Sequence, residues 1–340
     1  MSKIAIIGAG AWGTALSIIF GRKQTHQVSL WAHEKEVRES IAQRRVNEKF
    51  LPGQTIPTCV TPCNDLAEAL ENAAIVIGVM PSQHCRGLFE EMRPHLRDET
   101  LIVSATKGLE ENSLMRMTEV IAQVIKTSDN RTPRIGALSG PSFAVEAARG
   151  DPTAITIASE DAELAASVQQ EFSDATFRVY TNDDPIGVEL GGALKNTIAI
   201  AAGVSAGLGL GHNSTAALIT RGLAEMTRLV LACGGKAETL GGLAGLGDLV
   251  LTCTGGLSRN RSVGVELGRG RRLREILAGM HGMVAEGVFT TTAAVGLARA
   301  RGVEMPITEQ MHAILHEGKA PRDAIYELMT RSGKSETLRM

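Results

Sequence analysis

The chain lacks an excess of charge of either sign. It has 35 Lys and Arg residues against 37 Asp and Glu residues, so its net charge at pH 7 is −2. A protein that binds nucleic acid or an anionic membrane through its general field needs a clear positive excess. The balance therefore argues against both partners, and any phosphate-bearing ligand must be held by a local site.

Cysteine is scarce and poorly spaced for disulfides or zinc. No two cysteines form a C-x-x-C pair, and their number is odd: Cys59, Cys63, Cys85, Cys233 and Cys253. This usage predicts reduced thiols, no metal site and a cytoplasmic location. The N-terminus also lacks a basic segment followed by a cleavable apolar one, so we expect no export.

No long apolar run is free of charge. The best candidate for a membrane span is residues 187–211, which contain seven glycines together with Glu189, Lys195 and Asn196. Charged side chains and frequent glycine both argue against a spanning helix. We therefore expect no integral membrane segment.

What is present begins with a strand, a glycine-rich turn and a helix. A β-branched run at 3–7 (KIAII) leads into residues 8–13 (GAGAWG), and a helical run follows at 14–20. A G-x-G-x-x-G in this context is the dinucleotide fingerprint. Its glycines permit a tight turn and close approach of a pyrophosphate, whose charge faces the helix N-terminus. We expect Gly8, Gly10 and Gly13 to bind a dinucleotide.

Strands and helices continue to alternate as far as residue 184. Further strands are predicted at 27–32, 74–80, 101–106, 135–139, 153–158 and 176–181, with helices near 83–96, 113–127 and 161–172. This order predicts an α/β domain with a Rossmann-type, doubly wound and mostly parallel sheet, and ligands beyond the carboxyl ends of its strands. Ser82, Lys107 and Ser142 follow such ends and are candidates for the cleft.

The pattern changes after Asp184-Pro185. Residues 186–340 show helical periodicity and no convincing strand. We therefore predict two domains: an NAD(P)-binding domain over 1–184 and an all-α substrate and catalytic domain over 185–340.

Cofactor choice depends on the end of the second strand. An NAD-selective fold usually places Asp or Glu there, whereas this chain has His33. Without that carboxylate a 2′-phosphate is not repelled, so NADP(H) is admitted. Glu34 and Glu36 follow, so NAD(H) is also admitted as the cofactor.

A single lysine stands out in the second domain. Lys195 lies on a predicted helix of small and apolar residues, and Glu189 does not share its face. It is either a core lysine that snorkels to solvent or a proton donor and acceptor. Asp248 is the acid that we expect to reach it once the domains close.

Asp248 follows a glycine-rich stretch and opens an apolar helix. Thr252 comes four residues later, so the two side chains share a face. The carboxylate either orients Lys195 or is a first-turn acid stabilised by the helix dipole.

A polar run follows two glycines at 255–256. Residues 258–261 (SRNR) present a hydroxyl, guanidinium groups and an amide, which suit a phosphate, especially if a helix begins there. The alternative is an ordinary N-cap at Ser258.

Six sequence motifs follow one another along the chain. They are GAGAWGTA at 8–15, TKGLE at 106–110, SGPSFAVE at 139–146, ALKN at 193–196, GLGDLVLTC at 245–253 and SRNR at 258–261. Together they closely resemble the bacterial NAD(P)-dependent glycerol-3-phosphate dehydrogenases, from residue 3 to about 330. The resemblance implies a Rossmann-type N-terminal domain and an α-helical C-terminal domain. It also implies NAD(P)H-dependent, reversible reduction of dihydroxyacetone phosphate to sn-glycerol 3-phosphate for phospholipid synthesis.

The resemblance also implies roles for individual residues. Lys195 resembles the catalytic acid/base, with Asp248 as its partner. The implied cofactor contacts are Ala11, Trp12, His33, Lys107, Ala144, Arg259, Val284 and Glu286. The implied substrate contacts are Lys107, Gly140, Ser142, Lys195, Asn196, Asp248, Thr252, Ser258, Arg259 and Asn260. Ala11 replaces a hydroxyl residue that is frequent in the family, which removes one hydrogen bond to the pyrophosphate.

Two other functions stay open on the residues alone. A hydroxyacid or sugar-acid dehydrogenase of similar build would require a substrate that carries a carboxylate in place of the phosphate. A non-catalytic dinucleotide-sensing module would have no use for Lys195, Asp248 and the 258–261 run together. The sequence also leaves open a homodimer and the ranking of NADP against NAD.

Overall fold

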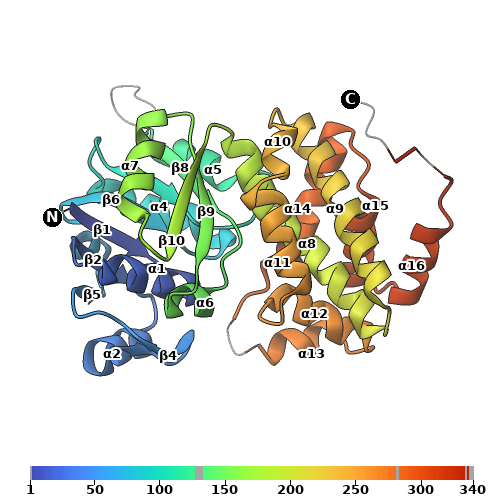
Figure 1. The fold of residues 1–340 in the computed structure, drawn as a ribbon, viewed down its shortest axis with the longest axis horizontal. Coiled ribbons are helices and arrows are strands. Elements are labelled where there is room, and N and C mark those ends of the chain that lie inside the picture. The colour runs from blue at the N-terminus through green and yellow to red at the C-terminus, as the bar shows by residue number, and fades with distance from the viewer. Residues whose placement is uncertain (1, 127–132, 281–282, 334, 337–340) are drawn as a thin grey trace. The chain divides into compact units, whose positions relative to one another are not determined.

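The computed structural model describes residues 2–126, 133–280, 283–333 and 335–336. The chain divides into two compact units (Figure 1). Unit 1 comprises Met1–Lys107 and Met115–Glu189, and unit 2 comprises Gly108–Leu114 and Leu190–Met340. The chain therefore passes from one unit to the other three times.

Unit 1 is built on a sheet of eight strands in the order β10-β9-β8-β7-β6-β1-β2-β5. The strands are β1 (Ser2–Ile7), β2 (His26–Trp31), β5 (Val60–Cys63), β6 (Ala73–Gly78), β7 (Leu101–Ser104), β8 (Ile135–Ser139), β9 (Thr153–Ala158) and β10 (Phe177–Asn182). All neighbours run parallel except β8 and β9, which are antiparallel. The predicted doubly wound, mostly parallel sheet is confirmed.

The helices of unit 1 connect these strands. They are α1 (Ala11–Arg22), α2 (Lys35–Arg44), α3 (Leu66–Leu70), α4 (Cys85–Met92), α5 (Met117–Val124), α6 (Ala144–Arg149) and α7 (Ala162–Phe172). The prediction of one helix over 83–96 was wrong, because 3-10 turns at Ser82–His84 and Arg93–His95 flank a shorter α4. Pro94 lacks the amide hydrogen that a continuing α-helix needs.

Sequence reasoning missed three short strands. β5 forms the sheet edge and contains Pro62, a residue that an edge strand tolerates because one side makes no ladder. β3 (Val46–Asn47) and β4 (Leu51–Thr55) form a separate antiparallel pair. These segments are too short and too polar to show the period-two pattern of a strand.

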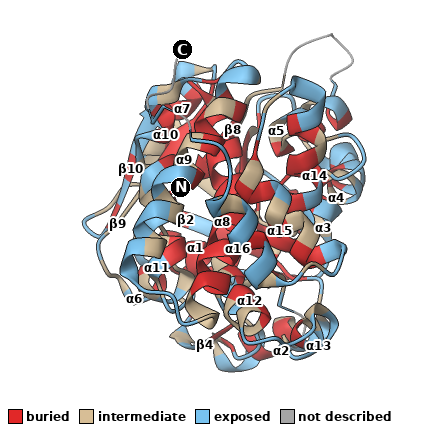
Figure 2. Cartoon of the chain, turned by 90° about the vertical axis from the view of Figure 1, so that its right-hand side faces the viewer, coloured by how far each residue is buried: buried red, intermediate tan, exposed pale blue. Residues whose placement is uncertain are grey.

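The core of unit 1 lies on both faces of the sheet. Ile4 and Ile6 of β1 belong to the cluster on one face, and Ala5 and Ile7 belong to the cluster on the other. Successive strand side chains point to opposite faces, so a strand covered on both sides is apolar throughout. This burial explains why these strands could be predicted from β-branched runs in the sequence. The buried residues are red in Figure 2.

The regular elements of unit 2 are all helices within the residues that the structure describes, as predicted. Its elements are α8 (Pro185–Gly207), α9 (His212–Ala232), α10 (Ala237–Leu240), a π turn (Leu243–Gly247), α11 (Asp248–Thr254), α12 (Arg259–Gly268), α13 (Leu273–Ala278), α14 (Glu286–Arg301), α15 (Pro306–His316) and α16 (Pro321–Met329). Every residue from 187 to 205 of α8 is buried. The helix of Lys195 is therefore a core element, although its first residues belong to unit 1.

The backbones of α8 and α12 touch where the helices meet. Two glycines of each helix, four residues apart, lie at this contact: Gly203 and Gly207 with Gly264 and Gly268. A Cβ added at Gly203 would lie 2.0 Å from the Arg261 carbonyl oxygen, and one at Gly264 would lie 2.0 Å from the Ile200 carbonyl oxygen. Only glycine permits this approach. The contact holds the start of α12 against the helix that carries Lys195.

Glu189, the acid nearest to Lys195 in the sequence, has its partners on α5. Its carboxylate accepts hydrogen bonds from the Thr118 amide at 2.8 Å, the Thr118 hydroxyl at 2.5 Å and Arg116 Nη1 at 2.6 Å. Burial raises the pKa of Glu189, and the Arg116 guanidinium and the Thr118 donors oppose that shift. Glu189 is thus committed within unit 1.

Candidate active site and cofactor loop

The glycine loop after β1 has the shape that its sequence predicts. Gly8 has a φ of +119°, and a Cβ there would lie 2.1 Å from the Val79 carbonyl oxygen. A Cβ on Gly13 would lie 1.9 Å from the Gly8 carbonyl oxygen, whereas Gly10 has nothing within 4 Å of that position. Two glycines thus permit close packing, and the third leaves open space beside the turn.

That open space lies at the N-terminus of α1. Gly10 is the N-cap, and no side chain accepts a hydrogen bond there. The first amide hydrogens of a helix have no partner within it and carry its positive dipole end. The turn therefore offers backbone donors to an anion such as a pyrophosphate.

The side chain of Asn47 forms hydrogen bonds with the glycine loop and the start of α1, and the sequence analysis did not identify this residue. Its side-chain nitrogen donates to the Ala9 carbonyl oxygen and to the Thr14 hydroxyl, both at 2.8 Å. The residue is fully buried. No local signal marks an asparagine that acts on a loop 38 residues away.

The remaining predicted cofactor positions of unit 1 surround this loop or the end of β2. Trp12 is half-buried, with its ring 6.4 Å from that of Phe177, and Ala144 begins α6, which packs on α1. His33 is exposed. Arg38 donates to the carbonyl oxygens of Ala32 and His33, both at 2.7 Å, so a guanidinium does lie beside the end of β2.

The carboxyl ends of β7 and β8 bring three predicted residues together. Lys107 Nζ donates to the Gly140 carbonyl oxygen at 3.2 Å, and Ser142 Oγ donates to the same oxygen at 3.0 Å. Gly140 has a φ of +143°, and a Cβ there would lie 2.9 Å from Ile155 Cα. Ser82, the third residue predicted from strand ends, is 1% exposed and accepts from Gln83 Nε2 at 3.3 Å, so protein encloses it.

Lys195 forms a buried ion pair with Asp248. The distance from Lys195 Nζ to Asp248 Oδ1 is 2.8 Å, and the two side chains are 7% and 2% exposed. The lysine therefore does not snorkel to the surface. The expectation that Asp248 reaches Lys195 is confirmed. Both residues belong to unit 2, so the pair forms within that unit and does not need the domain closure that we expected.

Thr252 completes this cluster. Its hydroxyl accepts from Lys195 Nζ at 2.7 Å and donates to the Asp248 carbonyl oxygen at 2.6 Å. Two N–H bonds of the ammonium are therefore directed by a carboxylate and a neutral hydroxyl. The adjacent Cys253 stays a neutral thiol, because burial raises its pKa to about 12.

Two amide side chains lie beside the lysine on the same unit. Asn260 Nδ2 donates to Asn196 Oδ1 at 2.9 Å, and the Gly287 amide donates to Asn260 Oδ1 at 3.0 Å. Ser258 Oγ accepts from the Arg261 amide at 3.2 Å, so Ser258 does act as the N-cap of α12.

Arg259 and Glu286 begin α12 and α14, and Val284 lies two residues before Glu286. Crowding by protein atoms lowers the pKa of the Arg259 guanidinium, and the Glu286 carboxylate opposes the shift. Arg259 as a residue is nevertheless exposed, so the guanidinium stays charged. The interaction shows that the starts of the two helices are close.

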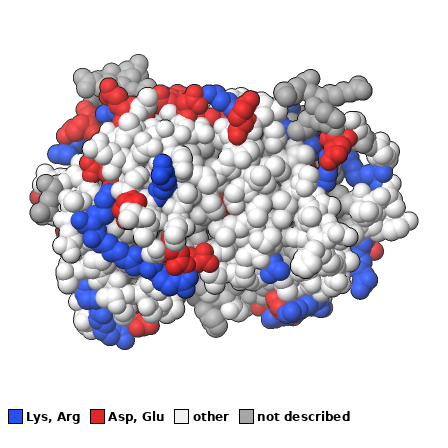
Figure 3. All heavy atoms as spheres, in the orientation of Figure 1, with Lys and Arg blue, Asp and Glu red and all other residues white. Residues whose placement is uncertain are grey.

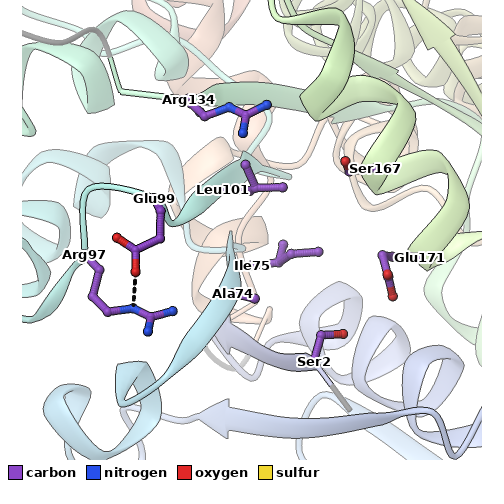
Figure 4. A pocket seen from close by; sticks show the side chains of 9 residues that line it. All are labelled: Ser2, Ala74, Ile75, Arg97, Glu99, Leu101, Arg134, Ser167 and Glu171. Atoms are coloured by element: carbon purple, nitrogen blue, oxygen red, sulfur yellow. Dashed lines mark ion pairs between the residues drawn. The ribbon is translucent and has the colours of Figure 1, made fainter.

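A separate pocket of about 290 Å³ lies at the opposite edge of the sheet (Figure 4). Its lining comes from the starts of strands, as at Ser2, Ile75 and Leu101. Its charged side chains already have partners, since Arg97 pairs with Glu99 and Arg134 with Asp161. Dinucleotides bind at the other ends of such strands, so this pocket is not the cofactor site.

The surface adds no general field for a phosphate. The face drawn in Figure 3 carries both signs of charge, with acidic side chains along its upper edge and basic ones at its lower left. Within the described ranges, no single helix is long and apolar enough to cross a membrane, and one bent pair (Ala237–Thr254 with Arg259–Gly268) meets that condition by length and composition only. Nor do the described residues contain a group of three or more His, Cys, Asp or Glu side chains that could hold a metal.

Comparison with known proteins gives one consistent result. Residues 3–165 match the family described as NAD-dependent glycerol-3-phosphate dehydrogenase N-terminus, and residues 184–326 match the corresponding C-terminus. A glycerol-3-phosphate dehydrogenase (NAD(P)+) of Koribacter versatilis is 65% identical over 99% of both chains. One of Acidobacterium capsulatum is 56% identical over 99% of this chain and 100% of the relative.

A solved structure agrees. The crystal structure of glycerol-3-phosphate dehydrogenase from Coxiella burnetii is 42% identical, with a TM-score of 0.92 over 97% of this chain and 99% of that one. The predicted fold class and NAD(P)-linked oxidoreductase function are confirmed over the two alternatives. The chain belongs to the NAD(P)-dependent glycerol-3-phosphate dehydrogenases.

Proposed function

We propose that Lys195 is the acid/base for reversible reduction of dihydroxyacetone phosphate to sn-glycerol 3-phosphate by NAD(P)H. The observation that carries the proposal is the buried pair of Lys195 and Asp248, with Nζ to Oδ1 at 2.8 Å. The product is a precursor of glycerophospholipids, and we propose that the reaction serves that synthesis.

The bound nicotinamide supplies the hydride to C2 of the substrate. Lys195 then gives a proton to the C2 oxygen, and its positive charge stabilises the alkoxide as it forms. Asp248 holds the ammonium in place, while the Thr252 hydroxyl accepts one N–H and fixes its direction. An ammonium that is oriented beforehand loses little entropy when the substrate binds.

The glycine loop fits the pyrophosphate of the cofactor. Gly10 leaves the space open, and the uncapped start of α1 supplies the donors. We propose further cofactor contacts through a set of nearby or motif-matched residues: Ala11, Trp12, His33, Lys107, Ala144, Arg259, Val284 and Glu286. Substrate contacts through Lys107, Gly140, Ser142 and Ser258 remain predictions.

Substrate recognition should depend on the phosphate through Arg259. Arg259→Ala removes a charge-assisted hydrogen bond worth on the order of 1.5–3 kcal/mol, so kcat/KM for dihydroxyacetone phosphate should fall roughly tenfold or more. Arg269→Ala is the matched control, because Arg269 follows the other end of α12 and pairs with Glu266 on the surface. Steady-state kinetics with dihydroxyacetone phosphate and with dihydroxyacetone test the proposal. Equal wild-type activity on the two substrates would contradict it.

Cofactor preference should depend on the end of β2. We expect both cofactors to work, with NADPH moderately preferred, because His33 replaces an acid and Arg38 lies beside it. His33→Asp should shift the ratio of kcat/KM values toward NADH by repelling the 2′-phosphate. His33→Asn is the neutral control. A ratio that is the same in the wild type and both variants would show that this position does not sense the phosphate.

We further propose that residues 1–184 bind the cofactor and that residues 185–340 carry the catalytic groups. A cytoplasmic location agrees with the five cysteines, which form no disulfide. A homodimer stays a prediction, which sedimentation velocity would check.

A further inference from the structure

One buried side chain from outside the glycine loop contacts the loop with a known direction. Asn47 belongs to β3 and is 0% exposed. The Phe50 amide donates to the Asn47 side chain at 3.1 Å. A backbone amide can only donate, so the Asn47 atom that meets it must be the oxygen. The nitrogen of the side chain is therefore the atom that faces Ala9 and Thr14.

The Asn47 nitrogen is used entirely on the loop and the start of α1. It donates to the Ala9 carbonyl oxygen and to the Thr14 hydroxyl, both at 2.8 Å. The Thr14 hydroxyl donates its own hydrogen to the same Ala9 oxygen at 3.2 Å. Thr14 is also 0% exposed. Two donors in a place closed to solvent therefore hold the Ala9 carbonyl.

The fixed carbonyl sets the direction of the next amide. The described peptide bonds are all trans, and a trans peptide unit points its C=O and its N–H in opposite directions. The Ala9 carbonyl faces Asn47, so the Gly10 N–H points away from Asn47. Within the described residues, no group accepts a hydrogen bond from this amide, and nothing lies within 4 Å of a Cβ built at Gly10. The Gly10 N–H is thus turned toward the open space beside the loop.

We propose that Asn47 is a positioning residue for the cofactor, which aims the Gly10 N–H at the pyrophosphate by holding the Ala9 carbonyl. This inference rests on the proposed binding of the pyrophosphate at the glycine loop. Glycine has the widest choice of backbone conformations, so an unsupported Gly10 would sample several directions for its amide. Asn47 removes that freedom in the free protein, and less conformational entropy is then lost when the cofactor binds.

Asn47 is itself anchored by the segments on either side of β3. Ser40 of α2 donates from its hydroxyl to the Val46 carbonyl oxygen at 2.8 Å. The Arg45 guanidinium donates to the Val60 carbonyl oxygen of β5 at 2.9 Å. The backbone that precedes Asn47 is therefore tied both to a helix of unit 1 and to the edge strand of its sheet. A side chain on such a support can hold a mobile glycine loop in one conformation.

The main test is Asn47→Ala, which removes both hydrogen bonds to the loop region. The dissociation constant of NADPH, measured by fluorescence titration, should rise roughly tenfold or more. The KM for NADPH should rise with it, while kcat at saturating cofactor should change less than about threefold, because Lys195 belongs to unit 2. NADH should lose affinity by the same factor, since both cofactors carry the pyrophosphate. An unchanged dissociation constant would overturn the inference.

A matched control and a measurement without cofactor separate positioning from a merely structural role. Ser159 Oγ donates to the Ile135 carbonyl oxygen at 2.8 Å at the start of β8, so Ser159→Ala also removes a buried hydrogen bond in unit 1. It should lower the thermal midpoint and leave NADPH affinity unchanged. In cofactor-free protein, hydrogen exchange of a peptide spanning residues 8–16 should be faster in Asn47→Ala than in the wild type and in Ser159→Ala. Equal exchange in all three proteins would contradict the positioning role.

Two further variants keep the test decisive. Thr14→Val removes the hydroxyl that lies between Asn47 and the Ala9 carbonyl, and it should also weaken NADPH binding. If Asn47→Ala does not fold, wild-type affinity in Thr14→Val would overturn the inference. Gly10→Val fills the open space, and the backbone there, with a φ of −65°, accepts any residue. Wild-type NADPH affinity in Gly10→Val would refute the proposed cofactor site itself, whereas a loss in Gly10→Val alone would refute only the role of Asn47.

Discussion

Lys195→Met should lower kcat by roughly 10²–10⁴-fold, because it removes both the proton donor and the charge that stabilises the alkoxide. Methionine keeps the length and the apolar stem of lysine, so the packing of α8 is preserved. NADPH affinity should hardly change, since the fingerprint loop and the start of α1 belong to unit 1. Single-turnover oxidation of NADPH and a binding titration separate the two effects.

The variant also removes the ammonium that lies 2.8 Å from the buried Asp248 carboxylate, which needs its own control. Removing one partner of a buried ion pair costs about 3–5 kcal/mol, so Lys195→Met alone should lower the thermal midpoint. Adding Asp248→Asn removes the carboxylate charge as well and should restore much of the stability without restoring kcat. A kcat within threefold of the wild type, with both ligands bound normally, would reduce Lys195 to a structural residue.

The fold could be predicted wherever burial leaves a local pattern. The strands with both faces covered, such as β1 and β6, are continuous apolar runs, and they were found. β5 escaped because Pro62 and its short length remove that pattern at the sheet edge. The helix over 83–96 was overextended because its apolar periodicity outlasts the helix that Pro94 ends.

Only some of the site residues could be predicted from the sequence, because only some of them stand in a local pattern. Motifs identified Lys195, Asp248 and Asn260, since each stands in a distinctive local setting. Their supports are distant in the chain and unremarkable locally: Asn47 acts on the glycine loop, and Gly287 acts on Asn260. A single hydrogen bond between remote residues leaves no periodicity, so only the three-dimensional structure identifies it.

The second large effect is expected at Gly264, where α12 touches α8. Gly264→Ala would place a Cβ 2.0 Å from the Ile200 carbonyl oxygen, a backbone atom that cannot turn aside. The helices must separate, which should cost at least about 2–3 kcal/mol and lower the thermal midpoint by roughly 5–10 °C. Differential scanning calorimetry measures this loss.

The same separation should also damage catalysis. α12 begins with Arg259 and Asn260, and α8 carries Lys195 and Asn196. Moving the helices apart therefore displaces the phosphate-binding guanidinium and the Asn260 amide from the acid/base. A misplacement of about 1 Å can cost about 10²-fold, and we expect kcat/KM to fall by that order in the protein that stays folded. Gly87→Ala is the matched control, because Gly87 is exposed on α4 with nothing within 4 Å of its Cβ position. That substitution should stabilise the chain by about 0.5–1 kcal/mol. Equal midpoints and equal kcat/KM in the two variants would show that the glycine contact does not hold the site.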